Sequence, residues 1–268
     1  MPTGFDHIVI AVNDLDQAVA DYTTAGFTVT PGGEHKGGAS HNALITFQDG
    51  AYFEIIAFKG EAPHRSHWPE LLRKGEGLVD YALRTDDLHR EAAALRTAGL
   101  DVGDPVDGGR FRPDGQRIDW QTLRLGRERG PSALPFYCHD LTVRTLRVPD
   151  GDAARHENGV TGVGGVTVVV NDLDEAGRKL RALTGSEATE VEVGEADGRR
   201  VRFPVGAGWI ELYEPGEIAV DARACLETRG ELPFEVTLTA PDGGGAVLDT
   251  DLTHGARLRV VAEAPVTA

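Results

Sequence analysis

Cysteine and basic residues are both scarce in this sequence. The two cysteines, Cys138 and Cys225, are too few for a disulfide framework, which favours a reducing compartment. Lys and Arg number 27 against 43 Asp and Glu, and the formal net charge is −16. A surface of this sign repels phosphate groups, so the composition argues against nucleic acid or an anionic membrane as the partner.

Long apolar runs and a secretory signal are missing as well. The apolar stretches are short and interrupted by charge, so none is long enough to span a bilayer. The first residues, MPTGFDHIVIAVND, have neither the basic region nor the apolar region of a signal peptide. We therefore expect a cytoplasmic globular protein. Its 268 residues suit one large domain or two domains of ordinary size.

What the sequence does contain is an internal repeat. The segment HIVIAVNDLD at 7–16 recurs as GVTVVVNDLD at 165–174 and, less closely, as DYALRTDDL at 80–88. Each copy opens with an apolar run that is typical of a buried strand and then reaches an Asp-Leu step. The aspartates of these steps are predicted helix N-caps, and a glycine follows each predicted helix. These residues are Asp14, Asp87 and Asp172, and Gly26, Gly99 and Gly185.

The runs that follow each helix define a β-α-β-β-β module. In the first copy they are 27–30, 42–47 and 52–58, and Asp49-Gly50 is a hairpin turn between the last two. The copy that begins at 165 repeats them, which makes Glu54 and Glu211 equivalent. The remaining predicted strands are 190–193, 200–205 and 209–213 in that copy, 100–102 and 118–125 in the middle copy, and 234–240 and 258–262 in the tail.

This arrangement predicts an α+β fold of tandem βαβββ modules. The middle copy carries a Gly- and Pro-rich insert at 104–115, and the tail from Leu232 is a degenerate fourth module without a helix. The turn-rich stretch 127–135 is the predicted boundary between two domains. Residues 1–130 would hold two modules, and residues 131–268 would hold one full module and the degenerate one.

Tandem modules with this Asp-Leu helix start resemble the vicinal oxygen chelate superfamily, and in particular its glyoxalase-like branch. That superfamily includes glyoxalase I, extradiol dioxygenases, fosfomycin-resistance transferases and bleomycin-binding proteins. The resemblance implies that paired modules form two open β-cups. The segments that carry it are FDHIVIAV (5–12), GGEH (32–35), HNALI (41–45), YFEII (52–56), EGLVDYALRTDDL (76–88), RPDG (112–115), LPF (134–136) and NGVTG (158–162).

The resemblance also implies a metal site in the N-terminal cup, with ligands from the first and last strands of each module. Transferred to this sequence, the ligands are His7 and Glu54, with Asp80 at the His7 position of the second module. Gln121 joins them if Trp120-Gln121 aligns with the pair that ends in Glu54. Nitrogen and carboxylate oxygen suit Zn, Fe, Mn, Co or Ni.

Departures from the family pattern narrow the chemistry. The superfamily's dioxygenases use two histidines and one glutamate, and the predicted N-terminal ligand set has one histidine. That difference favours Lewis-acid chemistry over oxygen activation. The C-terminal cup has Gly165 at the His7 position, and Glu211 has no evident partner there, so this cup is predicted to be free of metal.

Several side chains allow more than one interpretation. His7 is either a packed, hydrogen-bonded residue or a ligand, and Glu54 in its apolar strand needs a metal, His7 or a substrate hydroxyl as partner. His41 and Asn42 either contact substrate at the cup mouth or make structural hydrogen bonds. The aromatic candidates for stacking on a flat ligand, with core packing as the alternative, are Trp120 and Phe53.

Three arginines and two histidines lie in predicted loops. The arginines Arg110, Arg112 and Arg117 near the insert either bind an anionic substrate or solvate a loop. His64 and His67 have a spacing that can suit a metal, but a solvated loop is the preferred interpretation.

Together these features predict an enzyme that acts on a small oxygenated metabolite in the N-terminal cup. The reaction would be of lyase or isomerase type, with Glu54 and His7 as catalytic groups. It would proceed by Lewis-acid chemistry, or by acid–base chemistry if no metal is bound. The alternative is a metal-free protein that binds and sequesters a small molecule. A homodimer is compatible with either function.

Overall fold

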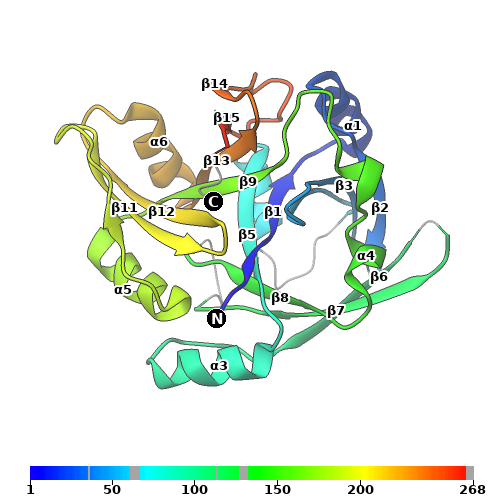
Figure 1. Cartoon of the computed structure of the whole chain (residues 1–268), viewed down its shortest axis with the longest axis horizontal. Helices are drawn as coiled ribbons and strands as arrows, with labels where there is room; N and C mark the ends of the chain where they lie inside the picture. The colour runs from blue at the N-terminus through cyan, green and yellow to red at the C-terminus, as the bar shows by residue number, and fades with distance from the viewer. Residues whose placement is uncertain (36, 61–66, 113, 127–131, 264–268) are drawn as a thin grey trace.

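The computed structural model describes residues 1–35, 37–60, 67–112, 114–126 and 132–263, and their strands form two sheets (Figure 1). The strands of the first sheet are β1 (Gly4–Ala11), β2 (Thr30–His35), β3 (Ser40–Thr46), β4 (Tyr52–Phe58), β5 (Gly77–Arg84), β6 (Val106–Phe111), β7 (Arg117–Leu123) and β8 (Phe136–Asp140). They close into a barrel in the order β1-β4-β3-β2-β6-β7-β8-β5.

The second sheet is open and has the order β10-β11-β12-β9-β13-β15-β14. Its strands are β9 (Gly162–Val169), β10 (Thr189–Glu190), β11 (Gly198–Val205), β12 (Gly208–Pro215), β13 (Leu232–Ala240), β14 (Gly244–Val247) and β15 (Leu258–Ala262). The helices are α1 (Leu15–Thr24), α2 (Trp68–Arg73), α3 (Leu88–Thr97), α4 (Arg144–Arg147), α5 (Leu173–Thr184) and α6 (Val220–Arg229), with a 3-10 turn η1 (Gly151–Ala154).

The predicted capping of the repeated helices is confirmed. The Asp14 carboxylate accepts hydrogen bonds from the backbone N–H groups of Asp16 and Gln17 at the start of α1. Asp87 and Asp172 cap α3 and α5 in the same way. These bonds satisfy N–H groups that have no partner within the helix, which is why the helix starts there.

The repeat is visible in the strand pairing, and the α+β fold of βαβββ modules is confirmed. β1 pairs in parallel with β4, and Val9 lies opposite Glu54. β9 pairs in parallel with β12, and Thr167 lies opposite Glu211. The two glutamates therefore occupy the same position in the two halves. β13 and β15 also pair in parallel, so the tail keeps the outer strands of a module.

The second module differs from its prediction. β6 lies inside the stretch expected to be an irregular insert. Its Gly108 is needed because a Cβ there would lie 2.4 Å from Nε1 of Trp120 on the neighbouring strand. The last strand of the module is β8 rather than residues 118–125, most of which lie in β7. β8 follows the proposed boundary at residue 130 yet belongs to the barrel, and residues 127–131 lie outside the described residues.

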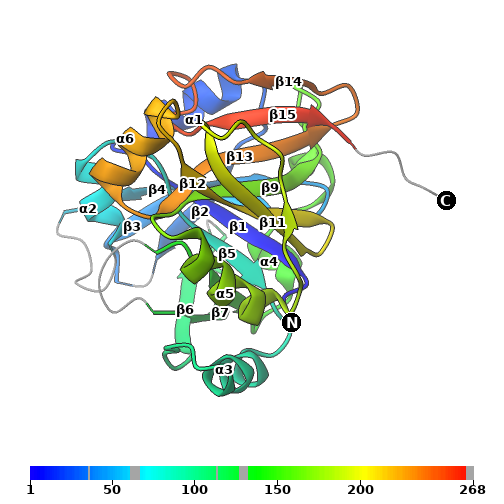
Figure 2. The same ribbon diagram turned by 90° about the vertical axis from the view of Figure 1, so that its left-hand side faces the viewer.

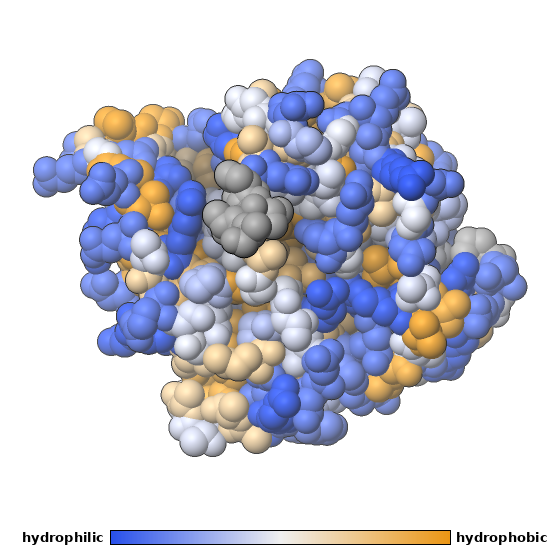
Figure 3. Space-filling view, viewed as in Figure 1, coloured by the Kyte–Doolittle hydropathy of each residue, from blue (hydrophilic) through white to orange (hydrophobic). Residues whose placement is uncertain are grey.

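The two sheets share one hydrophobic core. The outward-facing side chains of the barrel, such as Ile8, Ile10 and Phe53, belong to the same buried cluster as Val166 and Leu212 of the second sheet. Figure 2 shows β9 and β13 running alongside β1 and β5, and β13 packs directly against β5. Polar side chains cover most of the face shown in Figure 3, in keeping with the strong net charge. Among the described residues, none of the helices is long and apolar enough to cross a membrane.

Candidate functional site in the N-terminal barrel

A bulge in β1 brings two polar side chains together inside the barrel. In the pairing with β5, Phe5 lies opposite Leu83 and His7 opposite Ala82, so Asp6 is the extra residue. Such a bulge changes the direction in which its side chains point. The Asp6 carboxylate therefore lies beside His7, and its Oδ1 is 2.6 Å from Nδ1 of the imidazole. Both residues are buried.

Two arginines from α4 hold the Asp6 carboxylate. Arg147 donates to both carboxylate oxygens at 3.0 and 2.9 Å, and Arg144 donates to Oδ2 at 2.6 Å. Asp140 at the end of β8 pairs with the same two arginines. Burial raises the pKa of Asp6, but Arg147, the hydrogen bond from His7 and Arg144 outweigh that effect and hold the pKa well below its usual value. Asp6 is therefore ionised.

The ionised Asp6 fixes the hydrogen on His7. A carboxylate can only accept hydrogen bonds, so Nδ1 of His7 carries the hydrogen of this short contact. In the neutral imidazole the other nitrogen, Nε2, then carries a lone pair. This nitrogen faces the interior of the barrel, 3.7 Å from Oε2 of Glu54. Two lone-pair donors that face each other leave room for a proton or a cation between them.

Glu54 itself is held by two further side chains. Nε2 of His35 lies 3.2 Å from Oε1, and the amide of Asn42 donates to the same oxygen at 2.6 Å. Burial works against ionisation, but His35, His7 and Asn42 lower the pKa of Glu54 from 4.5 to about 2. Glu54 is thus an ionised carboxylate at neutral pH although only 6 % of it is exposed.

Aromatic rings surround these polar groups. The imidazole of His7 stacks on Tyr52 with ring centroids 4.8 Å apart, and Phe136 meets it edge-on at 5.3 Å. Trp120 lies edge-on to His35 at 6.2 Å. Charged groups therefore converge between flat apolar surfaces inside the barrel, a combination of side chains that small-molecule sites also use.

Two of the predicted ligands have other hydrogen-bond partners. Asp80 is buried, but it accepts hydrogen bonds from Nε1 of Trp68 and from the backbone of Tyr81. Gln121 lies on β7 and donates to Asp107. The alignment that made Gln121 a ligand is wrong because β7 is not the last strand of its module. In the first module Val9 lies opposite Glu54, and in the second module the equivalent residue, Ala82, lies opposite Phe136. The ring of Phe136 therefore occupies the position that Glu54 has in the first module.

The candidate substrate contacts divide between the two faces of the barrel wall. Asn42 and Trp120 lie at the cluster, as described above. His41 lies directly opposite the exposed Glu34 on the neighbouring strand, on the other face of β3 from Asn42. Phe53 is fully buried in the core against Phe47, with ring centroids 4.9 Å apart. Because successive side chains of a strand point to opposite faces, neither His41 nor Phe53 faces Glu54.

Sequence reasoning did not identify three residues of the site: Asp6, Arg147 and His35. Asp6 depends on a bulge, and Arg147 lies on a short helix far along the chain. The segment GGEH, which ends in His35, could have indicated a functional histidine, because two glycines come shortly before it.

His67 does not lie in the solvated loop that the sequence predicted. It is buried, and its Nε2 lies 4.0 Å from Asp80. His64 lies outside the described residues.

The side chains around Glu54 include donor types that divalent metals use. His7, His35 and Glu54 offer two imidazole nitrogens and a carboxylate, a combination that suits Zn or Fe. Asp6 would act as the outer partner that orients His7. Among the described residues, the group of three such side chains whose ligand atoms all lie within 4.8 Å of one another is Asp6, His7 and Cys138, and not His7, His35 and Glu54. It does not suit a cation, because two arginines already neutralise Asp6 and burial raises the pKa of the Cys138 thiol.

The C-terminal counterpart of Glu54 has different partners. Glu211 is buried, and it accepts hydrogen bonds from Arg200 at 3.1 Å and Arg202 at 2.7 Å. Both arginines lie on β11 of the same module, and not in the fourth module, where the sequence offers Glu211 no evident partner. Two guanidinium groups occupy the space that a cation would need, so this position is an internal salt bridge.

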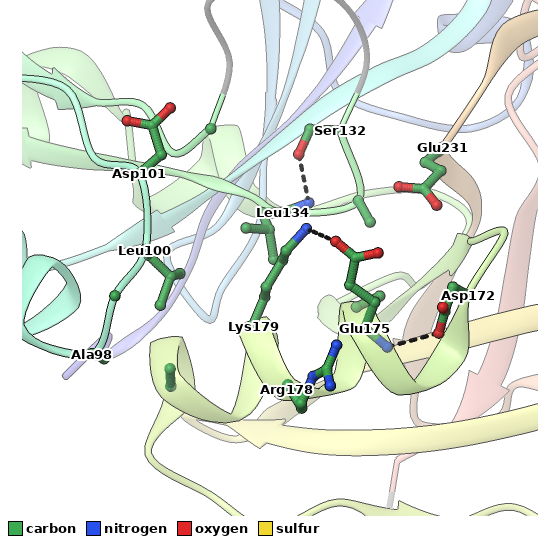
Figure 4. A pocket seen from close by; sticks show the side chains of 15 residues that line it. Ala98, Leu100, Asp101, Ser132, Leu134, Asp172, Glu175, Arg178, Lys179 and Glu231 are labelled. Carbon is green, nitrogen blue, oxygen red and sulfur yellow. Dashed lines mark hydrogen bonds and ion pairs between the residues drawn. The ribbon is translucent and has the colours of Figure 1, made fainter.

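A separate cavity of about 670 Å³ lies between the end of α3 and the outer face of α5 (Figure 4). Three of the charged residues that line it stabilise α5: Lys179 pairs with Glu175, and Asp172 caps the helix. Gly126 and Ser132, which flank the undescribed residues 127–131, also line it. The convergent polar groups of the barrel are not part of this cavity.

Comparison with known proteins agrees with this architecture. Residues 5–184 match the family described as glyoxalase-like domain, and the chain belongs to that family. No curated protein sequence matches the chain. Among solved structures, a hypothetical protein from Staphylococcus aureus is similar over 97 % of this chain and 99 % of its own, with 13 % identity and a TM-score of 0.73.

Two further solved structures are similar to the chain, with lower TM-scores. A mutant of 4-hydroxymandelate synthase from Streptomyces coelicolor has 17 % identity and a TM-score of 0.60, over 90 % of this chain and 72 % of that one. A xylose isomerase-like TIM barrel/4-hydroxyphenylpyruvate dioxygenase fusion protein has 16 % identity and a TM-score of 0.55, over 90 % of this chain and 37 % of that one. At these identities the likeness shows the fold.

Proposed function

We propose that this protein is an enzyme that moves a proton on a small oxygenated metabolite inside the N-terminal barrel, in a reaction of isomerase or lyase type. The observation that carries the proposal is the chain of contacts Asp6–His7–Glu54. It holds a buried imidazole in one tautomer and directs its free nitrogen at an ionised carboxylate. Such an arrangement is typical of a positioned general base.

Each residue of the cluster has its own role in this reaction. Nε2 of His7 accepts a proton from a carbon or hydroxyl group next to a carbonyl. Asp6 and Glu54 then stabilise the imidazolium from either side. The charges of His35 and His7 that hold the pKa of Glu54 at about 2 belong to the protonated imidazoles, and His7 is protonated once it has taken the proton. Glu54 then stays ionised, so its part is electrostatic rather than the proton transfer expected from sequence. Nε2 of His7 then returns the proton to a different atom of the substrate. His35 is the most accessible of these groups, with 21 % of its side chain exposed, and helps to keep Glu54 ionised.

A divalent metal, where bound, would be held by His7, Glu54 and His35, and would supply Lewis-acid polarisation of the substrate oxygen. In that case Asp6 still orients His7, and Asn42 still positions Glu54. Two imidazoles lie at Glu54 rather than the single histidine expected from sequence, so the argument from one histidine against oxygen activation does not hold.

The test is consumption of small hydroxy, oxo and enol compounds by the purified protein, followed by NMR. We expect turnover by the wild type and a loss of about 10²- to 10⁴-fold in His7→Gln, the usual contribution of a general base. Equal turnover in His7→Gln contradicts the proposal. Compounds that bind without being consumed favour the sequestering function instead.

A further inference from the structure

Arg110 is a buried cation inside the same barrel. Only 5 % of it is exposed. It lies on β6 directly opposite His35 on β2, so the two side chains share the inner face of the barrel wall. Glu54 and Tyr52 are close enough to favour its charged form, yet burial outweighs them and lowers the pKa of the guanidinium.

The other arginines of this region have acidic partners. Arg144 and Arg147 pair with Asp6 and Asp140, Arg112 with Asp114, and Arg117 with Asp119. Arg110 instead donates one hydrogen bond, from Nη2 to the backbone oxygen of Arg147 at 3.1 Å. Within the described parts of the chain, no carboxylate lies within 4.0 Å of it.

An arginine that is buried without an acidic partner is costly to the folded protein. Its five N–H groups form a planar fork that matches a carboxylate. The single bond to the Arg147 carbonyl engages one nitrogen and leaves the rest of the fork for another acceptor. The side chain therefore has the features of a site for an anionic group that arrives with the ligand.

We propose that Arg110 anchors the carboxylate of a small organic acid, which defines the substrate class of the barrel site. Trp120 provides a flat surface for the remainder of the ligand, since it lies edge-on to His35 at the same charged cluster. A single carboxylate fits better than a phosphate, because the ionised Glu54 is close by and repels a doubly charged group more strongly. The catalytic use of the acid rests on the proposed function, whereas its binding does not.

Calorimetric titration with matched ligand pairs tests this assignment. Mandelate and phenylpyruvate are compared with their primary amides, which have nearly the same shape but no charge. We expect the wild type to bind at least one acid 10-fold or more tightly than its amide. Arg110→Met should remove that preference. Arg117→Met is the matched control, because Arg117 lies on the next strand, is paired with Asp119 and is 55 % exposed; it should keep the preference.

Thermal unfolding without ligand separates a binding role from a structural one. An arginine kept for binding weakens the empty protein, so Arg110→Met should melt at the wild-type temperature or above it. A wild type with no preference for acids, an unchanged preference in Arg110→Met, or a melting temperature several degrees lower in that variant each overturns the assignment. Arg110-dependent binding without turnover would contradict only the proposed function. Turnover of uncharged compounds with no preference for acids would contradict only the role of Arg110.

Discussion

Glu54 and Glu211 stand at the same position in the two halves of the chain but face opposite kinds of partner. Each lies on the last strand of its module, opposite Val9 in one half and Thr167 in the other. Glu54 faces the imidazoles of His7 and His35, and Glu211 is neutralised by Arg200 and Arg202. One copy of a repeated position thus has an ionised carboxylate that faces two imidazoles, while the other forms a salt bridge with two arginines.

A first prediction concerns metal content. Any divalent metal that the wild-type protein, purified without a histidine tag, holds or takes up from zinc or manganese should be lost in His7→Ala and Glu54→Ala. Asp80→Asn and Gln121→Ala should keep it, because those side chains have other partners. Elemental analysis of the five proteins makes the comparison.

Two other results of that analysis would change the account. Metal that survives both His7→Ala and Glu54→Ala would contradict the ligand set. A wild type free of metal, even after incubation with zinc or manganese, would assign the proton transfer to His7 and its carboxylate partners alone.

A second prediction concerns the carboxylate behind His7. Asp6→Asn removes the negative charge that two buried arginine contacts require. The free energy of unfolding should fall by about 3–5 kcal/mol, as when one partner of a buried ion pair is removed. Urea unfolding measures this loss. Thr3→Ala, an exposed change near the same strand, is the control and should stay within about 0.5 kcal/mol of the wild type.

A third prediction concerns pH in the metal-free protein. The pKa of Glu54 falls from 4.5 to about 2 on folding, so its ionised form stabilises the native state fully above pH 4.5. That contribution is lost as the pH falls towards 2. Between pH 7 and pH 3 the wild type should lose about 2 kcal/mol more stability than Glu54→Gln, which lacks the titrating group. Equal losses in urea unfolding at the two pH values would contradict the assigned environment of Glu54.

Much of the fold could be predicted because local sequence signals define the repeat. Asp14, Asp87 and Asp172 cap their helices through contacts of two or three residues' separation, which a sequence displays directly. β6 was missed because its glycines are typical of loops. They are present because Trp120 on the neighbouring strand lies against Gly108, a contact set by pairing rather than by local preference.

The site could be predicted only where it follows the repeat. His7 and Glu54 lie on adjacent parallel strands and were found. His35 on β2 pairs with Arg110 on β6, and this contact is one of the two residue pairs that close the barrel between these strands. The two strands are far apart in the sequence, so no local pattern predicts the pairing. Asp6 reaches His7 only because β1 bulges there, and an alternating strand would have turned it away.

The most direct test of the central claim compares Glu54→Gln with Glu211→Gln in the turnover assay. These changes are chemically identical and fall on equivalent positions. The account predicts that Glu54→Gln loses activity by about 10²-fold or more. Glu211→Gln should lose stability, since it leaves two arginines unpaired, but retain its activity per folded molecule. Loss of activity in Glu211→Gln together with normal activity in Glu54→Gln would place the chemistry in the C-terminal sheet and contradict the account.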